Sequence, residues 1–350
     1  MKELLAYPNI TIRSAMKRLS KIGQKCLVII DKKNLLLGTL SDGDIRKAIL
    51  NGFSMNDSVE NIYQKNSKFI NEKDYNPLDA KKLFIENNYD LIPIINGEGK
   101  VKKILMLESI LRGVDSRIKK KLNAPVVIMA GGKGTRMEPF TKILPKPLIP
   151  VHDKPIIEHI IDRFKSFGCN SFHLSVNYKS RILKAYFEEL NPSHSYKFIN
   201  ESKPLGTAGS LKELSGKFNE PFFVTNCDII IKADYFSLYQ FHEKNSYDIT
   251  LVASTKEYII PYGTCKLNEN GSLDALSEKP SFDFLINTGL YIVNPDLLDL
   301  IPPNQFYHIT DLINEAKKQN MNIGVYPIDE NLWIDVGQWA EYKQATENLL

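Results

Sequence analysis

The chain has 350 residues, 43% of them hydrophobic and 10% aromatic, which suits two globular domains with apolar cores. Its 45 lysines and arginines against 41 acidic residues give a formal net charge of +4, an excess too small and scattered to indicate nucleic-acid binding. Four widely spaced cysteines without a CxxC pair argue against a disulfide framework or a zinc site, and the polar start and short apolar runs predict a cytoplasmic protein that does not enter a membrane.

The first third of the chain contains an internal repeat. AMKRLSKIGQKCLVIID at residues 15–31 returns as AKKLFIENNYDLIPIIN at residues 80–96, 65 residues later. Each copy has helical spacing followed by a short apolar run, and a second strand and a helix follow in both. The arrangement resembles a tandem pair of cystathionine-β-synthase (CBS) domains, which implies one domain at 1–60 and another at 61–118. Since CBS pairs often associate, we expect a homo-oligomer.

A candidate ligand site lies in the first copy. In the segment GTLSDGD, Ser41 ends a predicted strand and Asp44 is the third residue of the next helix. The CBS resemblance implies that these two residues contact an adenine nucleotide. The same S-x-x-D spacing is also a helix-capping pattern, which needs no ligand. The second copy has Met106 and Ser109 at the equivalent positions, so at most one site keeps this pair.

A polar segment separates the repeat from the rest of the chain, and we place a linker at 119–124. The sequence PVVIMAGGKGTRMEPFTKILPKPLIPV then begins at Pro125. Its glycines allow the backbone to turn close to a ligand, and successive N–H groups of such a loop can hold phosphates. A Rossmann fingerprint would need a glycine where Met137 stands, and a Walker loop would need the order Gly-Lys-Ser/Thr.

The combined pattern GGxGTRxxPxTxxxPKP resembles the signature of the sugar-phosphate nucleotidyltransferases. The resemblance covers residues 125–350 and implies a catalytic domain with an α/β fold, in which a mixed, mainly parallel Rossmann-like sheet has helices on both faces. It implies catalytic roles for Arg136, Lys146 and Lys279. It also implies that the nucleotide is bound by Ala130, Gly131, Gly132, Gly134, Thr135, Glu201, Gly206, Thr207 and Ala208.

Later motifs follow in the family's order. Asp228 ends the apolar run PFFVTNCD, and Asp335 lies in WIDVG. The resemblance implies that both bind Mg²⁺, which prefers one or two carboxylates together with phosphate oxygens. It also implies that the sugar is bound by Glu278, Asn287, Thr288 and Gly289. A turn, a strand or a cap would explain each motif taken alone, and a capped helix start likewise explains His308.

The reaction that this resemblance implies is attack of a sugar 1-phosphate on a nucleoside triphosphate, with release of pyrophosphate. Paired CBS domains before such a transferase resemble the glucosamine-1-phosphate guanylyltransferases of bacterial legionaminic acid biosynthesis, which implies GTP and glucosamine 1-phosphate as substrates. Alternatives are GTP with mannose 1-phosphate, or UTP or dTTP with glucose 1-phosphate. A non-catalytic nucleotide sensor is disfavoured because the lysine, arginine and acidic residues are all present.

Overall fold

The computed structural model describes residues 2–87, 89–106, 121–192, 194–339 and 341–343. The chain forms two compact units, the first made of Met1–Lys119 with Lys256–Phe284 and the second of Lys120–Thr255 with Leu285–Leu350. Ser109 and the first residues of the expected linker lie outside the described residues. We call residues 256–284 the arm; the sequence analysis had assigned them to the catalytic domain without distinction.

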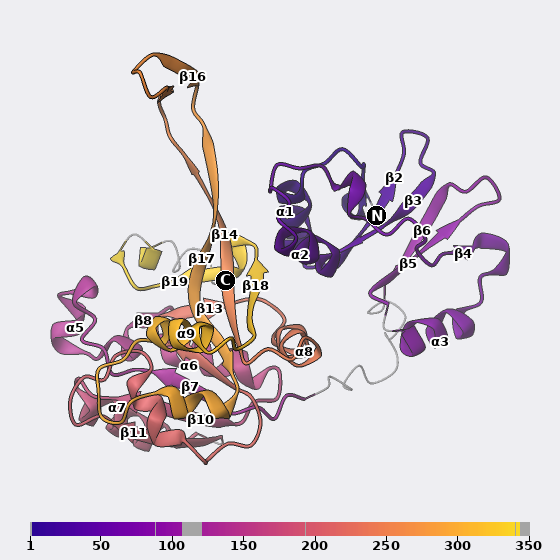
Figure 1. Ribbon diagram of the computed structural model, residues 1–350. Helices are drawn as coiled ribbons and strands as arrows, with labels where there is room; N and C mark the ends of the chain where they lie inside the picture. Colours follow the sequence, from indigo (N-terminus) through magenta and orange to yellow (C-terminus); the bar gives the residue numbers. More distant parts are fainter. Residues whose placement is uncertain (1, 88, 107–120, 193, 340, 344–350) are drawn as a thin grey trace. The chain divides into compact units, whose positions relative to one another are not determined.

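The first unit contains two three-stranded sheets of the same topology, β1-β2-β3 and β4-β5-β6 (Figure 1). In each, the first pair of strands is parallel and the second antiparallel. The elements are η1 (Lys2–Leu4), β1 (Leu5–Ala6), α1 (Ile12–Ile22), β2 (Cys26–Ile30), β3 (Leu36–Ser41), α2 (Asp42–Leu50), η2 (Val59–Asn61), β4 (Ile70–Asn71), η3 (Glu72–Asp74), α3 (Pro77–Asn87), β5 (Leu91–Ile95) and β6 (Val101–Met106).

The repeat in the sequence is a repeat in strand register. Cys26 lies opposite Ser41 in the first sheet, and Leu91 lies opposite Met106 in the second, so both partners are displaced by the same 65 residues. The two sheets meet at equivalent positions, where Leu35 and Lys100 form an isolated bridge. Cys26, Ile30, Leu91 and Ile95 belong to one shared apolar cluster. The duplication therefore has an approximate two-fold relation, in which each copy covers the apolar edge of the other.

The second unit contains a seven-stranded sheet in the order β11-β10-β7-β12-β17-β14-β18. β17 runs antiparallel to β12, whereas the pairs β11–β10, β10–β7, β7–β12 and β14–β18 are parallel. The expected mixed, mainly parallel sheet is confirmed. Its strands are β7 (Val126–Met129), β10 (Ser171–Val176), β11 (Ser195–Asn200), β12 (Phe222–Asn226), β14 (Ile249–Ile259), β17 (Ser281–Val293) and β18 (Ile323–Ile328).

Helices cover both faces of this sheet. Val126 and Ile128 of β7 pack with residues of α6, α7 and α8, and the alternate residues Val127 and Met129 pack with η6, η7 and α9. The covering elements are α6 (Ile156–Lys165), α7 (Ser180–Leu190), η6 (Gly209–Leu214), α8 (Tyr235–Lys244), η7 (Pro295–Leu300) and α9 (Ile309–Lys318). The smaller elements are η4 (Thr135–Met137), α5 (Phe140–Ile143), η5 (Lys146–Leu148), β8 (Pro150–Val151), β9 (Lys154–Pro155), β13 (Ile229–Ile231), η8 (Glu330–Leu332) and β19 (Trp333–Asp335).

The arm is a ribbon formed by the ends of β14 and β17 and, at its tip, by β15 (Thr264–Leu267) and β16 (Leu273–Ser277), drawn at the top of Figure 1. Within the first unit, Arg13 of α1 forms ion pairs with Glu257 and Asp283 of the arm. Among the described residues, no helix has the length and apolar character needed to span a membrane.

Candidate active site

The candidate site lies where four adjacent parallel strands of the second unit end. Gly131 follows β7, Asn177 follows β10, Glu201 follows β11 and Asp228 follows β12 by two residues. Because these strands are parallel neighbours, their carboxyl ends share one edge of the sheet. In open α/β sheets this edge is where ligands bind.

The signature loop between β7 and η5 folds back on itself. Gly134 has a φ of 66°, and a Cβ at this position would lie 2.9 Å from Thr141 Cγ2 and 3.1 Å from Lys146 Cβ. The Thr141 hydroxyl donates to the Gly134 carbonyl at 2.9 Å. A glycine is required here because the conformation is left-handed and the loop passes directly against the base of Lys146.

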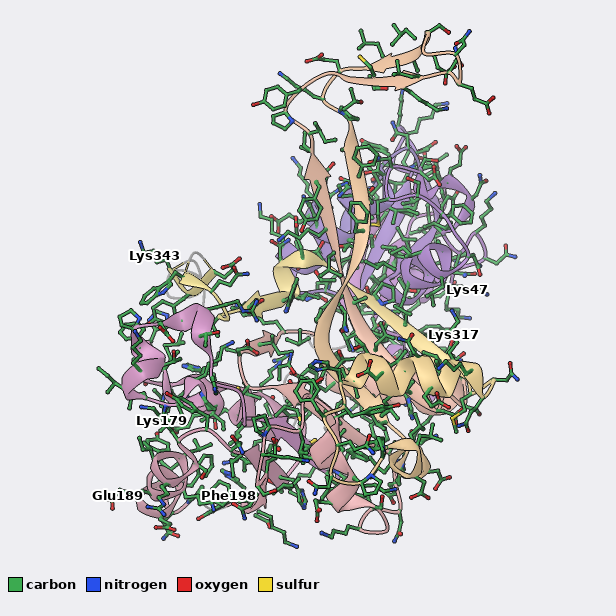
Figure 2. The ribbon with its side chains drawn as sticks, turned by 60° about the vertical axis from the view of Figure 1, so that its left-hand side comes forward. Lys47, Lys179, Glu189, Phe198, Lys317 and Lys343 are labelled. Carbon is green, nitrogen blue, oxygen red and sulfur yellow. The ribbon has the colours of Figure 1, made fainter. Side chains whose placement is uncertain are left out.

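The outer part of this loop is open and cationic. Gly132, Thr135 and Arg136 are exposed, and a Cβ on Gly132 would meet no atom within 4 Å. Lys179, labelled in Figure 2, donates to the carbonyls of Lys142 and Ile143 at 2.6 and 2.9 Å and so anchors α5. The loop thus has a fixed base and an accessible rim that carries backbone N–H groups and a guanidinium, as phosphate binding requires.

Lys146, Asp228 and Asp335 come together around Gly337. A Cβ on Gly337 would lie 2.8 Å from Asp335 Oδ1, 2.9 Å from Asp228 Oδ2 and 3.3 Å from Lys146 Nζ. Lys146 is only 8% exposed and pairs with Asp228. β13 and β19 pair antiparallel with Ile229 opposite Asp335, which brings the second carboxylate beside the first. Residues separated by nearly two hundred positions thereby form one charged cluster.

The two carboxylates are chemically suited to a divalent cation. Burial raises the pKa of Asp335, and the negative charge of Asp228 raises it further, although the Gly337 N–H and Lys146 oppose this. A cation between the two oxygens would relieve both effects. Two carboxylates fit Mg²⁺, which usually takes one or two carboxylates together with waters and substrate phosphate oxygens. The described residues contain no group of three or more His, Cys, Asp or Glu that could hold a metal by themselves.

Glu201 lies beneath the glycine loop and is held on both carboxylate oxygens. Oε1 accepts from the Ser175 hydroxyl, and Oε2 accepts from the Leu205 N–H at 3.0 Å. Ser175 in turn lies 2.8 Å from the Ser210 hydroxyl, and both serines are fully buried. A Cβ on Gly131 would lie 2.9 Å from Glu201 Oε1. The carboxylate therefore sits at a fixed position immediately beside the loop backbone.

The PLGTAG segment packs on the chain before α9. We expected its glycines to allow close approach to a nucleotide, but a Cβ on Gly206 would lie 2.6 Å from the carbonyl oxygen of Tyr307. The N–H groups of Ala208 and Gly209 both donate to that same carbonyl. The close approach at Gly206 is thus made to the protein's own backbone, and the fully buried Ala208 has no N–H left to offer a ligand. The Thr207 hydroxyl accepts from the Ile309 N–H at 3.0 Å, which uses one of its two acceptor sites.

The predicted sugar-binding strand is partly structural. Thr288 is 2% exposed, and its hydroxyl donates to the Val252 carbonyl at 2.8 Å, so its side chain ties β17 to β14 instead of facing a sugar. Gly289 has a φ of 88° and lies against the Asn226 amide, where a Cβ would come within 2.4 Å of the nitrogen. Asn287 is exposed and donates to the Tyr291 hydroxyl. Of the three, Asn287 keeps an accessible polar side chain.

Glu278 and Lys279 belong to the arm, within the first unit, and both are exposed. Lys279 has a φ of 46°, so the Glu-Lys-Pro segment forms a tight turn between β16 and β17.

In the same unit, Ser41 and Asp44 form a complete capping box at the start of α2. Asp44 also accepts from the Gln64 amide at 2.8 Å. The capping interpretation of this pair is therefore realised in the structure, and a nucleotide would have to displace these bonds.

Several residues of the site escaped the sequence analysis. Asn177 donates to the Glu201 carbonyl at 2.8 Å and lies against Gly131. Ser175 and Tyr307 hold Glu201 and the PLGTAG segment. Asn177 directly follows SFHLSV, whose alternation of polar and apolar residues predicts a strand, so its place at the end of a strand was a signal that could have found it. Tyr307 had no comparable signal.

Two known families match parts of this chain. The model of the family described as Nucleotidyl transferase matches residues 125–350. The chain belongs to this family. The CBS domain model matches residues 2–51.

Among curated relatives of this nucleotidyl transferase, mannose-1-phosphate guanyltransferases from Yarrowia lipolytica and Saccharomyces cerevisiae are 36% and 35% identical, each over 63% of this chain. The chain spans 62% and 63% of their respective lengths. A similar fold occurs in the crystal structure of HddC from Yersinia pseudotuberculosis, with a TM-score of 0.51 and 23% identity over 65% of this chain and 100% of that one.

Proposed function

We propose that this protein transfers a guanylyl group from GTP to a hexose 1-phosphate and releases pyrophosphate. The observation that carries the proposal is the meeting of Lys146, Asp228 and Asp335 around Gly337, next to an open glycine loop that bears Arg136. These groups supply positive charge, a pair of metal ligands and backbone N–H groups at one edge of the sheet. Such a set suits two phosphorylated substrates better than any other substrate class.

The chemistry needs no protein nucleophile. An oxygen of the sugar phosphate attacks the α-phosphorus of GTP, the bond from that phosphorus to the bridging oxygen breaks, and the β- and γ-phosphates leave as pyrophosphate. Cys227, one residue before Asp228, is buried, and burial raises the pKa of its thiol to about 12, so it stays protonated. The protein's task is to position two anions and stabilise the charge that moves to the leaving group.

In this proposal Asp228 and Asp335 would hold Mg²⁺, which neutralises phosphate oxygens when it is bound. Arg136 holds the leaving pyrophosphate at the open rim of the loop. The nearly buried Lys146 binds the attacking phosphate of the sugar. Its ion pair with Asp228 holds the ammonium group in position before the substrate binds. The family resemblance also implies that Lys279 contacts the sugar phosphate and that Glu278 contacts the sugar hydroxyls, and both roles stay predictions.

Glu201 supports guanine as the base. A carboxylate only accepts hydrogen bonds, and guanine presents two adjacent donors, N1–H and the N2 amino group. Uracil and thymine present a single N3–H between two carbonyl acceptors, which a carboxylate repels. Glu201 is the acidic side chain that lies beside Gly131, fixed by Ser175 and Leu205. The names of the relatives point to the same nucleotide.

For the sugar, the relatives favour mannose 1-phosphate, whereas the pairing of CBS domains with the transferase had favoured glucosamine 1-phosphate. We therefore propose mannose 1-phosphate as the first substrate to test. The prediction of glucosamine 1-phosphate and a role in legionaminic acid synthesis rests on the resemblance of the domain arrangement alone. An adenine nucleotide at Ser41 and Asp44 likewise remains a proposal.

The deciding experiment measures pyrophosphate release by the full chain with Mg²⁺. GTP, UTP, dTTP, CTP and ATP are each combined with the 1-phosphates of mannose, glucosamine, N-acetylglucosamine and glucose. We expect the largest rate with GTP and one of the first two sugars. A dominant rate with UTP or dTTP would overturn the assignment of the base but keep the reaction. No release from any pair, with or without adenine nucleotides to engage the CBS domains, would favour a nucleotide sensor.

The proposal that Glu201 recognises guanine can be tested separately with a single substitution. Glu201→Gln keeps one acceptor oxygen but replaces the other with an amide donor, which opposes the guanine N–H groups. We expect the KM for GTP to rise about 5- to 150-fold, in line with about 1–3 kcal/mol for one base-specific contact, while the KM for the sugar phosphate changes little. Equal weakening with every nucleotide would show that Glu201 acts only as a support for the loop.

A further inference from the structure

Two aromatic residues near the end of the described chain bind backbone carbonyls on both sides of Lys146 in the sequence. The Trp339 indole N–H donates to the Glu138 carbonyl at 3.0 Å. The Tyr342 hydroxyl donates to the Pro150 carbonyl at 2.8 Å. We call Trp339 and Tyr342 the aromatic pair. Its two hydrogen bonds fasten the chain before and after Lys146 to one short segment.

The aromatic pair also packs on α5. The Phe140 ring centroid lies 4.9 Å from that of Trp339 and 6.1 Å from that of Tyr342, and the rings of the pair are 6.0 Å apart. The Tyr342 N–H donates to the Gln338 carbonyl at 2.9 Å, so the pair lies on one helical turn, where residues three apart share a face. Tilted and edge-on rings at these separations attract one another. In the part of the chain that the structure describes, neither Phe140 nor Trp339 belongs to an apolar core, so this contact fastens the loop.

The bond to Glu138 lies nearer to Arg136 than the other anchors of α5 do. Glu138 is two residues after Arg136. The Tyr178 hydroxyl donates to the Thr141 carbonyl at 3.2 Å, and Lys179 binds the next two carbonyls, so these anchors act farther along the chain. Loss of the Trp339 contact would therefore free the part of the loop that carries the guanidinium, while the later carbonyls stay anchored.

The aromatic pair follows the segment that carries the second carboxylate. Trp339 is four residues after Asp335 and two after Gly337. Asp335 is itself held beside Asp228 by the pairing of β13 with β19. The hydrogen bond to Glu138 therefore links the loop that carries Arg136 to the strand that carries Asp335.

We propose that Trp339 and Tyr342 are positioning residues, which fix the loop carrying Arg136 and Lys146 relative to Asp335. The inference rests on the function proposed above, because it takes these three side chains as the groups that bind the phosphates and the metal. The aromatic pair acts through the backbone carbonyls that it binds and needs no contact with a substrate. Since a misplacement of about 1 Å costs about 100-fold in rate, a small loosening of the loop has a large kinetic effect.

The first test measures whether the aromatic pair holds the loop, and it needs no substrate. Trypsin cleaves after lysine and arginine, and the loop offers Lys133, Arg136 and Lys142, which are all exposed. A folded protein is cleaved at such sites when the segment opens locally. In the full chain with Trp339→Ala, we expect cleavage at these three sites, assigned by mass spectrometry, to be about tenfold faster or more. Trp339→Phe keeps a ring but loses the indole N–H, so the increase should be smaller. Unchanged cleavage in Trp339→Ala would overturn the proposal.

Tyr239→Phe is the matched control for Tyr342→Phe. The Tyr239 hydroxyl of α8 also donates to a proline carbonyl, that of Pro221, at 3.1 Å. Pro221 directly precedes β12, so this bond lies at the amino end of the strand, whereas the candidate site lies at the carboxyl end. We expect faster cleavage of the loop in Tyr342→Phe and no change in Tyr239→Phe. Equal cleavage in the two variants would mean that the loop opens through a general loss of stability, which contradicts a positioning role.

The second test measures turnover with the most active substrate combination. Trp339→Ala should lower kcat about tenfold or more and change the KM of either substrate by less than about threefold, because misplaced groups lose contacts made in the transition state. Trp339→Phe should restore part of kcat, and Tyr239→Phe should keep the wild-type value. A normal kcat in a Trp339→Ala variant whose loop is cleaved faster would show a purely structural contact and overturn the proposal. A wild type inactive with every combination would instead refute the proposed function, and the cleavage rates would then decide whether the aromatic pair positions the loop.

Discussion

The substitution Gly337→Ala should impair catalysis while leaving the fold almost intact. Gly337 does not have a positive φ, so its backbone accepts an alanine without strain. The added methyl would nevertheless lie 2.8 and 2.9 Å from the oxygens of Asp335 and Asp228, and 3.3 Å from Lys146 Nζ. Ordinary contacts begin near 3.4 Å, so the two carboxylates must each move by about 0.5 Å. The Asp335 carboxylate also accepts from the Gly337 N–H, which limits how it can move.

The expected size of the effect follows from that displacement. A misplacement of 1 Å in a catalytic group costs about 100-fold in rate, so we expect kcat/KM to fall about 10- to 100-fold, or about 1.4–2.7 kcal/mol of barrier. The Mg²⁺ concentration for half-maximal rate should rise as well, because the two proposed ligands are the groups displaced. The free energy of unfolding should drop by less than about 1 kcal/mol, since side-chain ends yield more easily than backbone.

Pyrophosphate release across a Mg²⁺ titration and urea unfolding measure the two effects. Gly97→Ala is the control, because a Cβ there meets no atom within 4 Å and its φ is not positive. Gly132→Ala is a second comparison inside the loop, again with no protein atom within 4 Å. An unchanged rate and Mg²⁺ dependence in Gly337→Ala would refute the assignment of this cluster as the catalytic centre. Loss of most of the stability would mean that the cluster cannot rearrange and would make the kinetic result uninformative about position.

Three further predictions rest on other features. Lys146→Ala and Asp228→Ala should each lower turnover by about two to four powers of ten, and a near-normal rate of pyrophosphate release in either folded variant would exclude that residue from catalysis. Burial lowers the pKa of His173 to about 4 and also lowers the pKa of His242. The unfolded chain therefore binds more protons below pH 6.5, and stability should be full above that pH and fall towards pH 4 by up to about 1.4 kcal/mol per pH unit for His173, with His242 adding a loss in the same direction. Urea midpoints that stay constant over this range would contradict it. Gly206→Ala should destabilise the second unit by about 1–3 kcal/mol more than Gly216→Ala, since both have positive φ but only Gly206 faces a backbone oxygen at 2.6 Å. Equal unfolding midpoints for the two variants would show that the contact is relieved cheaply.

The fold was largely predictable because its signals are local. The 65-residue repeat in the sequence reappears as a 65-residue repeat in strand register, with the same parallel and antiparallel pairs. Apolar runs that end in glycine or aspartate marked β7 and β12 and the edge of the sheet at which both strands end. The separate character of the arm was not predictable. Its strands alternate Tyr258, Phe282 and Phe284 with acidic residues, a pattern that indicates a half-buried strand but cannot say which molecule covers it.

The glycines show that a sequence motif can indicate a close approach to the backbone without indicating which group makes it. A glycine in a motif indicates that something approaches the backbone closely, but the sequence does not name the approaching group. At Gly134 it is the signature loop itself, at Gly206 it is Tyr307, and at Gly337 it is the charged cluster. Thr288 illustrates the same limit for a polar side chain, because its hydroxyl is used by the neighbouring strand. The motifs predicted which segments make close contacts, and the groups that they contact came from the structure.

The charged cluster, finally, explains why the last part of the chain is needed for the site. Asp228 follows β12, whereas Asp335 lies at the end of β19, and the antiparallel pairing of β19 with β13 brings them together. The Val336 N–H donates to the Asp228 carbonyl at 2.9 Å, so the backbone of each aspartate's segment holds the other. Two carboxylates this close repel each other, and the nearly buried Lys146 offsets part of that repulsion. The strand pairing therefore keeps the two carboxylates close together in spite of their electrostatic repulsion. A divalent cation would neutralise the negative charge that Lys146 alone does not offset.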